Sequence, residues 1–309
     1  MKSALIIGQR QLVVTGGFFR TVRLQAEWYE FVDSPEWFLE QLKAQKVNAD
    51  LLTFTQRLSK TVPEFPFHSE GDSLAVLRIA SYDKWWKEQI NDKTRNMVRK
   101  AAKKGVVIRL VKFDDELVSG IESIYNESPI RQGKPFRHFG KPFEIVKSAH
   151  STFLDRSDFI GAYYEGELIG FVKLVHQGEW SSMMQILSKM SHRDKAPTNA
   201  LLAKAVETCA ERGVPQLQYG IWSTRGIGDF KMHHGFERIE VPRYYVPLTA
   251  KGRLVMRSGL HRGAAEFMPQ RALDYFISLR SRWYNFKFRN YRMNGAVAQM
   301  AERARKREG

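Results

Sequence analysis

The chain has 309 residues, of which 43% are hydrophobic, so it can bury the core of one large domain or of two modest ones. A single cysteine excludes an internal disulfide, and the longest apolar runs fall short of the roughly 18 residues that suggest a membrane span. We therefore expect a globular cytoplasmic protein without a transmembrane segment.

The net charge of +16 is unevenly distributed along the chain. Residues 250–309 hold 14 Lys and Arg but only four Asp and Glu. A second basic run extends from Lys93 to Lys104 on one predicted helix, YDKWWKEQINDKTRNMVRKAAKKG. Such surfaces are either simply solvated or attract polyanions such as RNA and anionic lipid.

Four strand-like pieces occupy the first 80 residues: SALIIG, QLVVTGG, DLLTFTQRL and SLAVLRI. After the basic helix, Gly105 stops the helix and residues 106–112 form a predicted strand. Asp114 then begins a helix that ends before Pro129, and a second helix covers roughly residues 143–153. The alternating segment FIGAYYEGELIGFVKLV predicts a hairpin, and WSSMMQILSKM a third consecutive strand.

A helix with a buried stripe follows these strands in NALLAKAVETCAERG. Thr198 or Asn199 is predicted to cap its first turn, and Gly213 to end it. The stripe includes Cys209, which we interpret as a core residue and not as a nucleophile. The remaining elements are a strand (QLQYGIW), a short helix (GDFKMHHG) and a final strand (ERIEVPRYYVPL). From residue 106 the predicted order is therefore βααβββαβαβ.

The loop before the striped helix, SHRDKAPTNA, contains the H-R-D-x-x-x-x-N of a protein-kinase catalytic loop. A kinase also needs an upstream glycine-rich loop and a downstream D-F-G, because these hold ATP and its metal ions. The sequence has no G-x-G-x-x-G, and its nearest imitation of D-F-G is Asp229-Phe230-Lys231. We therefore reject the kinase interpretation.

The element order resembles the GNAT acyltransferase fold over residues 106–249. Gly235-Phe236 matches the Gly-Phe that commonly precedes the last GNAT strand, while RKAAKKGV and FKMHHGFE are similar to motifs of the FemAB branch. The resemblance implies an α/β (α+β) fold with a mixed central sheet flanked by helices. Residues 1–105 would form a smaller degenerate α/β region, which could be a reduced first GNAT-like copy, and residues 250–309 a basic helical extension.

In a GNAT fold the loop before the striped helix holds the donor's pyrophosphate with backbone N–H groups and the positive end of the helix. Here that loop carries our candidate donor-binding residues, which are His192, Arg193, Lys195, Thr198 and Asn199. The family's R-x-x-G-x-G/A glycines are missing, and Pro197 removes one N–H. This departure argues against acetyl-CoA as donor, although an ordinary basic turn remains the alternative interpretation.

Lys231 stands where many GNAT enzymes place the tyrosine that protonates the leaving thiolate. A lysine cation suits a developing oxyanion, and FemAB-type transferases, which take an aminoacyl group from an RNA ester, resemble this chain in having Phe-Lys at that place. We therefore predict Lys231 as a catalytic residue and Phe230 as a substrate-binding one. The alternative is that Lys231 is a surface residue of a short helix.

The loop between the first two helices concentrates basic residues around Gly133 and Pro135. Arg131, Lys134 and Arg137 are predicted to bind an anionic group of the acceptor, and His138 to act as general base. A purely structural role for this histidine stays open. We expect no metal site, since no His, Cys or Asp cluster has metal-ligand spacing along the chain.

Two functions remain open from the sequence. The first is an acyltransferase that moves an acyl or aminoacyl group from acyl-CoA or aminoacyl-tRNA to an amine acceptor and holds no tightly bound cofactor. The second is a non-catalytic GNAT-like binding module. In both, the tail after Pro269 contacts RNA or an anionic membrane surface, or else packs on the domain while its arginines stay solvated. The basic residues of the tail that we select are Arg280, Arg282, Lys287, Arg289 and Arg292.

Overall fold

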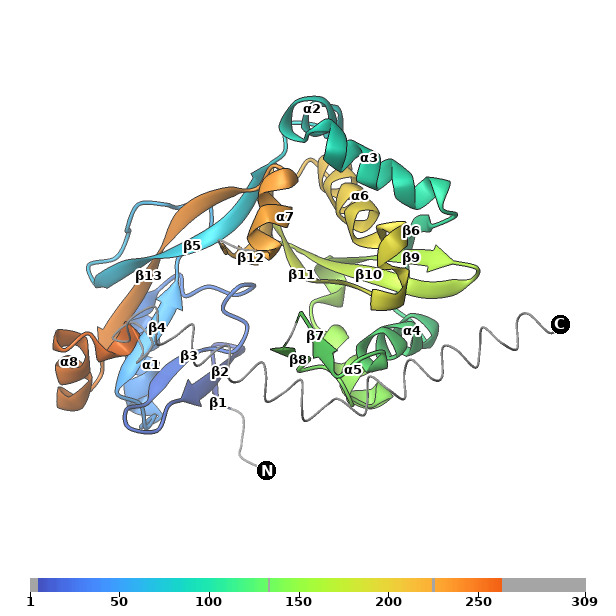
Figure 1. Cartoon of the computed structure of the whole chain (residues 1–309). Helices are drawn as coiled ribbons and strands as arrows, with labels where there is room; N and C mark the ends of the chain where they lie inside the picture. Colours follow the sequence, from blue (N-terminus) through green and yellow to red (C-terminus); the bar gives the residue numbers. More distant parts are fainter. Residues whose placement is uncertain (1–4, 133, 224–225, 263–309) are drawn as a thin grey trace.

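The computed structural model describes residues 5–132, 134–223 and 226–262. In this part of the chain one sheet of eleven strands has the order β1-β2-β3-β4-β13-β5-β12-β11-β10-β9-β6, and β7 and β8 form a separate hairpin (Figure 1). The strands are β1 (Leu5–Ile7), β2 (Arg10–Thr15), β3 (Thr21–Leu24), β4 (Leu51–Thr55), β5 (His68–Arg78), β6 (Val107–Val111), β7 (Ile130–Arg131), β8 (Lys134–Pro135), β9 (Ser157–Tyr164), β10 (Glu167–His176), β11 (Trp180–Ser188), β12 (Gln216–Ile221) and β13 (Glu237–Pro247).

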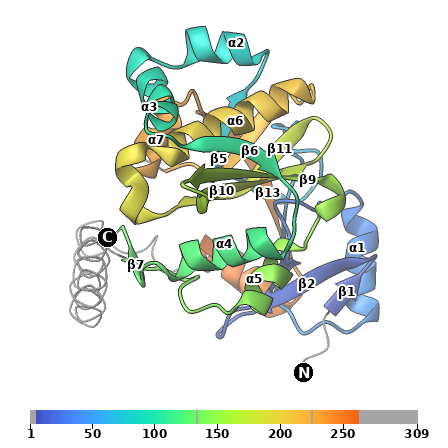
Figure 2. The same cartoon turned by 90° about the vertical axis from the view of Figure 1, so that its right-hand side faces the viewer.

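Helices cover both faces of the half of the sheet that ends at β6. Figures 1 and 2 show α4 and α5 on one face, and α3, α6 and α7 on the other. The helices are α1 (Pro35–Ala44), α2 (Tyr82–Lys84), α3 (Asp92–Lys103), α4 (Asp115–Asn126), α5 (Phe143–His150), α6 (Pro197–Glu211), α7 (Ile227–His233) and α8 (Ala250–Arg257), and shorter turns are η1 (Trp85–Gln89), η2 (Leu154–Arg156), η3 (Met190–Lys195) and η4 (Leu260–Arg262).

The element order expected for a GNAT-like fold is confirmed. From residue 106 it reads β6, α4, α5, β9, β10, β11, α6, β12, α7, β13. Local signals explain the agreement: Asp114 accepts a hydrogen bond from the Leu117 amide at 2.8 Å and so begins α4. Glu165 and Gly166 both have positive φ and turn the β9–β10 hairpin. Cys209 is buried in the stripe of α6, as expected.

β5 joins the predicted N-terminal region to the GNAT-like part. It pairs antiparallel with β12 on one side and with β13 on the other, and β13 also pairs with β4. The predicted segments 1–105 and 106–249 therefore share one sheet. A second core lies around β4 and β13, where Phe54 stacks on Tyr244 with ring centroids 5.0 Å apart.

Two local predictions were wrong. The segment predicted as one basic helix is interrupted, because Asn91 accepts a hydrogen bond from the Thr94 amide and starts α3 anew after η1. Neither Thr198 nor Asn199 caps α6. Its cap is Ala196, which adopts a left-handed conformation (φ 54°) without a side-chain cap, and Pro197 occupies the first helical turn.

The selected tail residues Arg280, Arg282, Lys287, Arg289 and Arg292 lie outside the described residues. Among the residues that are described, no helix combines the length and the apolar character needed to cross a bilayer.

Candidate functional site

β11 and β12 separate part-way along their length. They pair in parallel only from Trp180 to Ser182 and from Gln216 to Gln218, and no pairing continues toward Ser188. On its other side β12 pairs with β5 from Gln216 to Ile221, so that beyond Gln218 its pairing is with β5 and not with β11. In the GNAT fold that the sequence resembles, an opening between these two strands admits the donor arm. We call this place the strand divergence.

Lys231 is buried at the strand divergence and is not a surface residue of α7. It is 4% exposed, and its Nζ donates a 2.7 Å hydrogen bond to the carbonyl oxygen of Ile221, the last residue of β12. Nζ also lies 4.6 Å from the ring centroid of Tyr219. Burial lowers the pKa of Lys231 from 10.5 to about 8. The side chain is therefore largely charged at neutral pH and loses its proton when the pH rises above about 8.

The end of α7 is fixed from two directions. The backbone carbonyl of His234 accepts a 2.9 Å hydrogen bond from Trp85 Nε1, and that of His233 accepts one from Thr94. Phe230 packs partly against the core, and its ring centroid lies 4.1 Å from that of His234. These contacts hold Lys231 in place from α3 and η1, segments that precede the GNAT-like elements in the sequence.

The predicted donor-binding residues gather on η3 and the start of α6. Thr198 Oγ1 lies 2.8 Å from Ser188 Oγ at the end of β11, whereas Lys195 Nζ lies over the ring of Tyr164 at 4.5 Å. His192 packs against the same ring, and burial together with nearby Lys195 lowers its pKa. Arg193 is exposed and Asn199 is half-buried. The structure thus brings these five residues together on one turn.

Glu127, which the sequence did not single out, holds the beginning of that turn. Its carboxylate accepts hydrogen bonds from the backbone amides of Met190 at 2.6 Å and Ser191 at 2.8 Å. Arg131 lies beside it, with Nη2 3.2 Å from the carboxylate and Nη1 donating to the Ser188 carbonyl at 2.7 Å. The carboxylate of Glu127 therefore binds two backbone amides at the start of the turn that leads from β11 to α6.

The predicted acceptor side has an unusual histidine. Arg137 Nε lies 3.1 Å from His138 Nε2, and Lys141 Nζ lies 3.2 Å from His138 Nδ1. Burial, and then these two cations, lower the pKa of His138 to about 4. His138 is thus neutral at pH 7 but a weaker base than the sequence suggested. Lys134 is exposed on β8.

A buried polar network lies behind His138. The Tyr125 hydroxyl donates to Gln185 Oε1 and lies 2.9 Å from His150 Nε2, and the His138 ring centroid lies 4.6 Å from that of Tyr125. Gln185 belongs to the part of β11 that has already left β12. The network therefore connects the acceptor loop to one side of the strand divergence.

The predicted residues form two groups on opposite faces of the sheet. Lys231 and Phe230 lie with α7, while Arg131, Lys134, Arg137 and His138 lie with α4 and α5 (Figure 1). The residues missed from the sequence were Glu127, Gln185 and Tyr125. Glu127 contacts residues 63 and 64 positions away, so no local pattern marks it. Among the described residues, the group of side chains placed to hold a metal lies elsewhere, at the start of β5.

No family model matches the chain, and no curated protein matches it. Similar solved structures include one described as FemX, with 11% identity and a TM-score of 0.56, covering 80% of this chain and 86% of that one. The C-terminal domain of a putative lysylphosphatidylglycerol synthetase from Agrobacterium fabrum has 11% identity and a TM-score of 0.55, covering 81% and 84%. L-PGS from Bacillus licheniformis has 15% identity and a TM-score of 0.54, covering 80% and 84%. At these identities the likeness shows a shared fold alone, and it agrees with the GNAT-like order of elements.

Proposed function

We propose that the chain is an amide-forming acyltransferase of the GNAT type, in which an amine attacks an acyl or aminoacyl donor at the strand divergence. The observation that carries the proposal is the burial of Lys231 against the last residue of β12, where β11 has already separated. A buried ammonium with a lowered pKa, at a place where two neighbouring strands stop pairing, is a typical functional arrangement.

In the proposed reaction the amine nitrogen attacks the donor carbonyl carbon and forms a C–N bond. Negative charge develops on the carbonyl oxygen and then on the leaving oxygen as the C–O ester bond breaks. The ammonium of Lys231 has three N–H donors and stabilises that charge, and it can return a proton to the leaving oxygen. The proton lost by the amine passes to solvent, because His138 lies on the opposite face of the sheet from Lys231 and its pKa of about 4 makes it a weak base.

The turn after β11 favours an RNA ester over coenzyme A as donor. The amides of Met190 and Ser191 are already bonded to Glu127, and the turn lacks the glycines that close around a pyrophosphate. An aminoacyl ester on RNA, the donor that a FemAB resemblance implies, does not depend on a pyrophosphate cradle.

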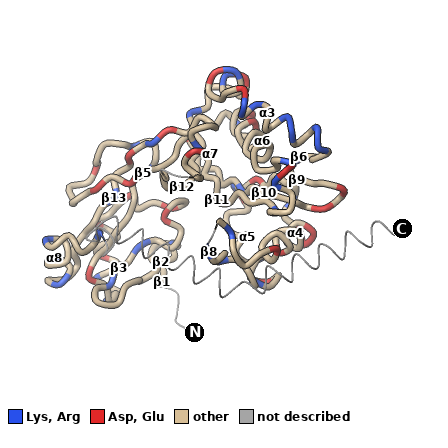
Figure 3. The backbone as a smooth tube through the Cα atoms, viewed as in Figure 1, with Lys and Arg blue, Asp and Glu red and all other residues tan. Residues whose placement is uncertain are grey.

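A basic surface beside the turn supports a polyanionic donor. The ring of Tyr164 contacts Lys195, and a Cβ on Gly105, at the end of α3, would lie 3.6 Å from the same ring. Lys103 and Lys104 are exposed at that helix end, and Figure 3 shows Lys and Arg along α3. Lys195 and the basic end of α3 therefore lie on two sides of one tyrosine, where Lys195 Nζ is also 3.6 Å from Asp194. A phosphate backbone would bind there by displacing Asp194 from Lys195.

The second candidate function is a GNAT-like binding module without chemistry. The Glu127 contacts favour it, because they show amides of the donor turn bonded within the protein. The two candidates differ in Lys231, since a binding module has no use for a buried ammonium at the strand divergence.

Native mass spectrometry of the protein purified from cells tests the proposal. We expect copurified RNA that dissociates with rising salt, and transfer of a labelled aminoacyl group from aminoacyl-tRNA to a panel of amines. Lys231→Ala should slow the transfer at least tenfold while RNA still copurifies. Lys43→Ala, which removes an exposed charge from α1, serves as matched control. Copurified RNA with no transfer to any amine would favour the binding module, and copurified acyl-CoA would overturn the choice of donor.

A further inference from the structure

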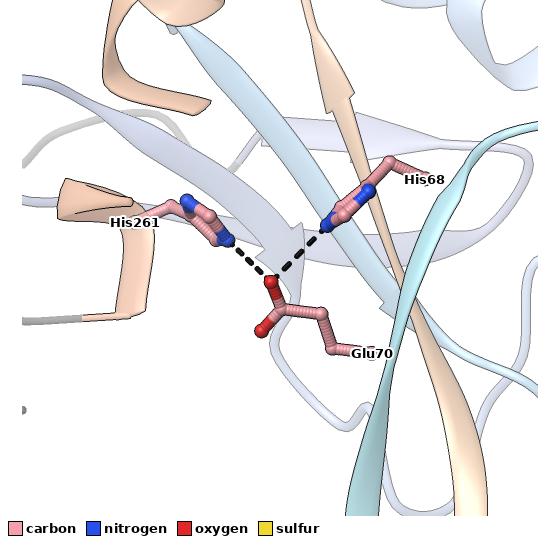
Figure 4. Close-up of side chains that lie close together, drawn as sticks. All are labelled: His68, Glu70 and His261. Atoms are coloured by element: carbon pink, nitrogen blue, oxygen red, sulfur yellow. Dashed lines mark hydrogen bonds and ion pairs between the residues drawn. The ribbon is translucent and has the colours of Figure 1, made fainter. Parts of the chain in front are cut away.

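Three side chains from two distant parts of the sequence meet at the start of β5. His68 and Glu70 lie on β5, and His261 lies on η4 after the last helix that the structure describes (Figure 4). Their nearest nitrogen and oxygen atoms all lie within 4.8 Å of one another. The spacing along the chain gives no hint of this group, which is why the sequence led us to expect no metal site.

Both imidazoles point at the same carboxylate oxygen. Glu70 Oε1 lies 2.7 Å from His261 Nε2 and 3.1 Å from His68 Nε2. The ring planes of the two histidines are 89° apart, so their Nε2 atoms approach that oxygen from different directions (Figure 4). Such an arrangement presents two nitrogens and one oxygen to a common point.

The His261 side chain is 3% exposed, and its Nδ1 is buried without a hydrogen-bond partner among the described residues. Without a metal ion, Nε2–H of His261 donates to Glu70 Oε1. When Nε2 binds an ion, the ring proton moves to Nδ1 and Nε2 provides its lone pair to the metal. His68 is half exposed and can rotate, which allows the three ligand atoms to close to the spacing of about 3.4 Å that tetrahedral zinc requires.

We propose that His68, Glu70 and His261 form a binding site for a divalent transition-metal ion, with Zn²⁺ as the ion that best suits two imidazoles and one carboxylate. Three protein ligands leave a fourth position open. A cavity of about 360 Å³, which His68 and His261 both line, lies next to the group and has room for a water or a small anion in that position. The ion would also fasten η4 to β5.

Arg262 is the neighbour that opposes a cation. Its Nε lies 3.0 Å from the same Oε1 of Glu70, so the ion must displace this guanidinium from that oxygen. Removing its charge should therefore strengthen metal binding. This expectation separates a metal site from a purely structural hydrogen-bond cluster, since Arg262→Gln would only weaken the latter.

The test is a Zn²⁺ titration of the full chain, free of any tag and first treated with a chelator, in competition with a chromophoric chelator. We expect one Zn²⁺ per chain and a rise in melting temperature on addition of the metal. His68→Gln, Glu70→Gln and His261→Gln should each weaken binding at least about tenfold, because even residues behind the ligands contribute that much. Arg262→Gln should tighten it.

His176→Gln is the matched control, because His176 also lies beside a carboxylate, Asp158, at 3.0 Å but has no second histidine there. It should bind Zn²⁺ as the natural chain does. His68→Gln changes a half-exposed side chain and should leave the fold intact in the absence of metal. The proposal is overturned if His68→Gln and Glu70→Gln bind Zn²⁺ as tightly as the natural chain, or if Arg262→Gln binds it more weakly.

Discussion

Lys173 and Lys231 are both buried lysines, and their electrostatic situations are nearly identical. Lys173 is fully buried, donates to the carbonyl oxygens of His150 and Thr152, and has its pKa lowered by burial to about 8. Lys231 is also buried, donates to a carbonyl and has its pKa lowered to the same value. A shifted pKa therefore does not distinguish a functional lysine from a structural one in this chain.

The difference lies in the strands around each lysine. Lys173 belongs to β10, which pairs with β9 and β11 on its two sides along nearly its whole length. Lys231 contacts the end of β12, where pairing with β11 has stopped. A substrate can approach a place where two strands separate, but not the middle of β10, which stays paired on both sides across a register shift against β11 next to Lys173. The pairing of the neighbouring strands, and not the lowered pKa, thus assigns the catalytic role to Lys231.

The largest expected effect is the loss of transfer rate when Lys231, but not Lys173, is replaced. Lys231→Ala should lower kcat at least tenfold, and on the order of 100- to 1000-fold if the ammonium stabilises the oxyanion directly. Lys173→Met should leave the rate per folded molecule unchanged. Steady-state kinetics with an aminoacyl donor measure both. Equal losses in the two variants would mean that the strand divergence does not set the lysines apart.

The next effect concerns the lowered pKa that the two lysines share, and its influence on the stability of the fold. Each binds its proton less tightly in the folded state, so between about pH 8 and 10.5 the unfolded chain holds more protons and stability rises with pH. The loss of stability caused by burying each charged ammonium group is fully present below pH 8. Relative to Lys173→Met, the natural chain should gain about 3 kcal/mol across that window.

Urea unfolding at both ends of the pH range measures this difference, and Lys231→Met should show the same sign. If the difference in free energy of unfolding between the natural chain and each variant does not change with pH, burial does not perturb the pKa of these ammonium groups.

A third prediction concerns the turn at the end of β11, which Glu127 holds. Glu127→Gln keeps the shape but removes the charge that accepts from the Met190 and Ser191 amides and pairs with Arg131. The free energy of unfolding should fall by about 2 kcal/mol. Glu116→Gln, at an exposed position of the same helix, should change it by less than about 0.5 kcal/mol. Comparable losses of stability in the two variants would show that the carboxylate of Glu127 does not stabilise the turn.

The smallest effects separate Thr198 from Asn199. Thr198→Val loses the hydrogen bond to Ser188 and should cost about 1 kcal/mol. Asn199→Ala should stay within about 0.5 kcal/mol, because Ala196 and not Asn199 begins α6. Thermal melts decide between them, and a larger loss in Asn199→Ala would restore Asn199 as the cap.

The sequence predicted the elements from β6 to β13 well, because their signals are local. The Asp114 cap, the Glu165-Gly166 turn and the periodic stripe that buries Cys209 each lie within one element or its edge. The predicted cap of α6 was wrong because Ala196 takes a left-handed conformation that no residue type announces there.

The candidate site could be predicted only in part. Lys231 was found through its spacing from Gly235-Phe236, and its burial against Ile221 required the structure. Glu127 was missed, and so was the meeting of His68 with His261, since both depend on pairings between distant segments. The insertion of β5 between β12 and β13 is the clearest example, because strand order is set by hydrogen bonds across more than 130 residues of sequence.

The most direct test of the central claim is a single-turnover comparison of donors on the natural chain. An aminoacyl ester of tRNA and acetyl-CoA are each offered with the same panel of amines, and the amide product is followed by mass spectrometry. The account predicts amide formation from the RNA ester and none from the thioester. Amide formation from acetyl-CoA alone, or from neither donor with any amine, would contradict it.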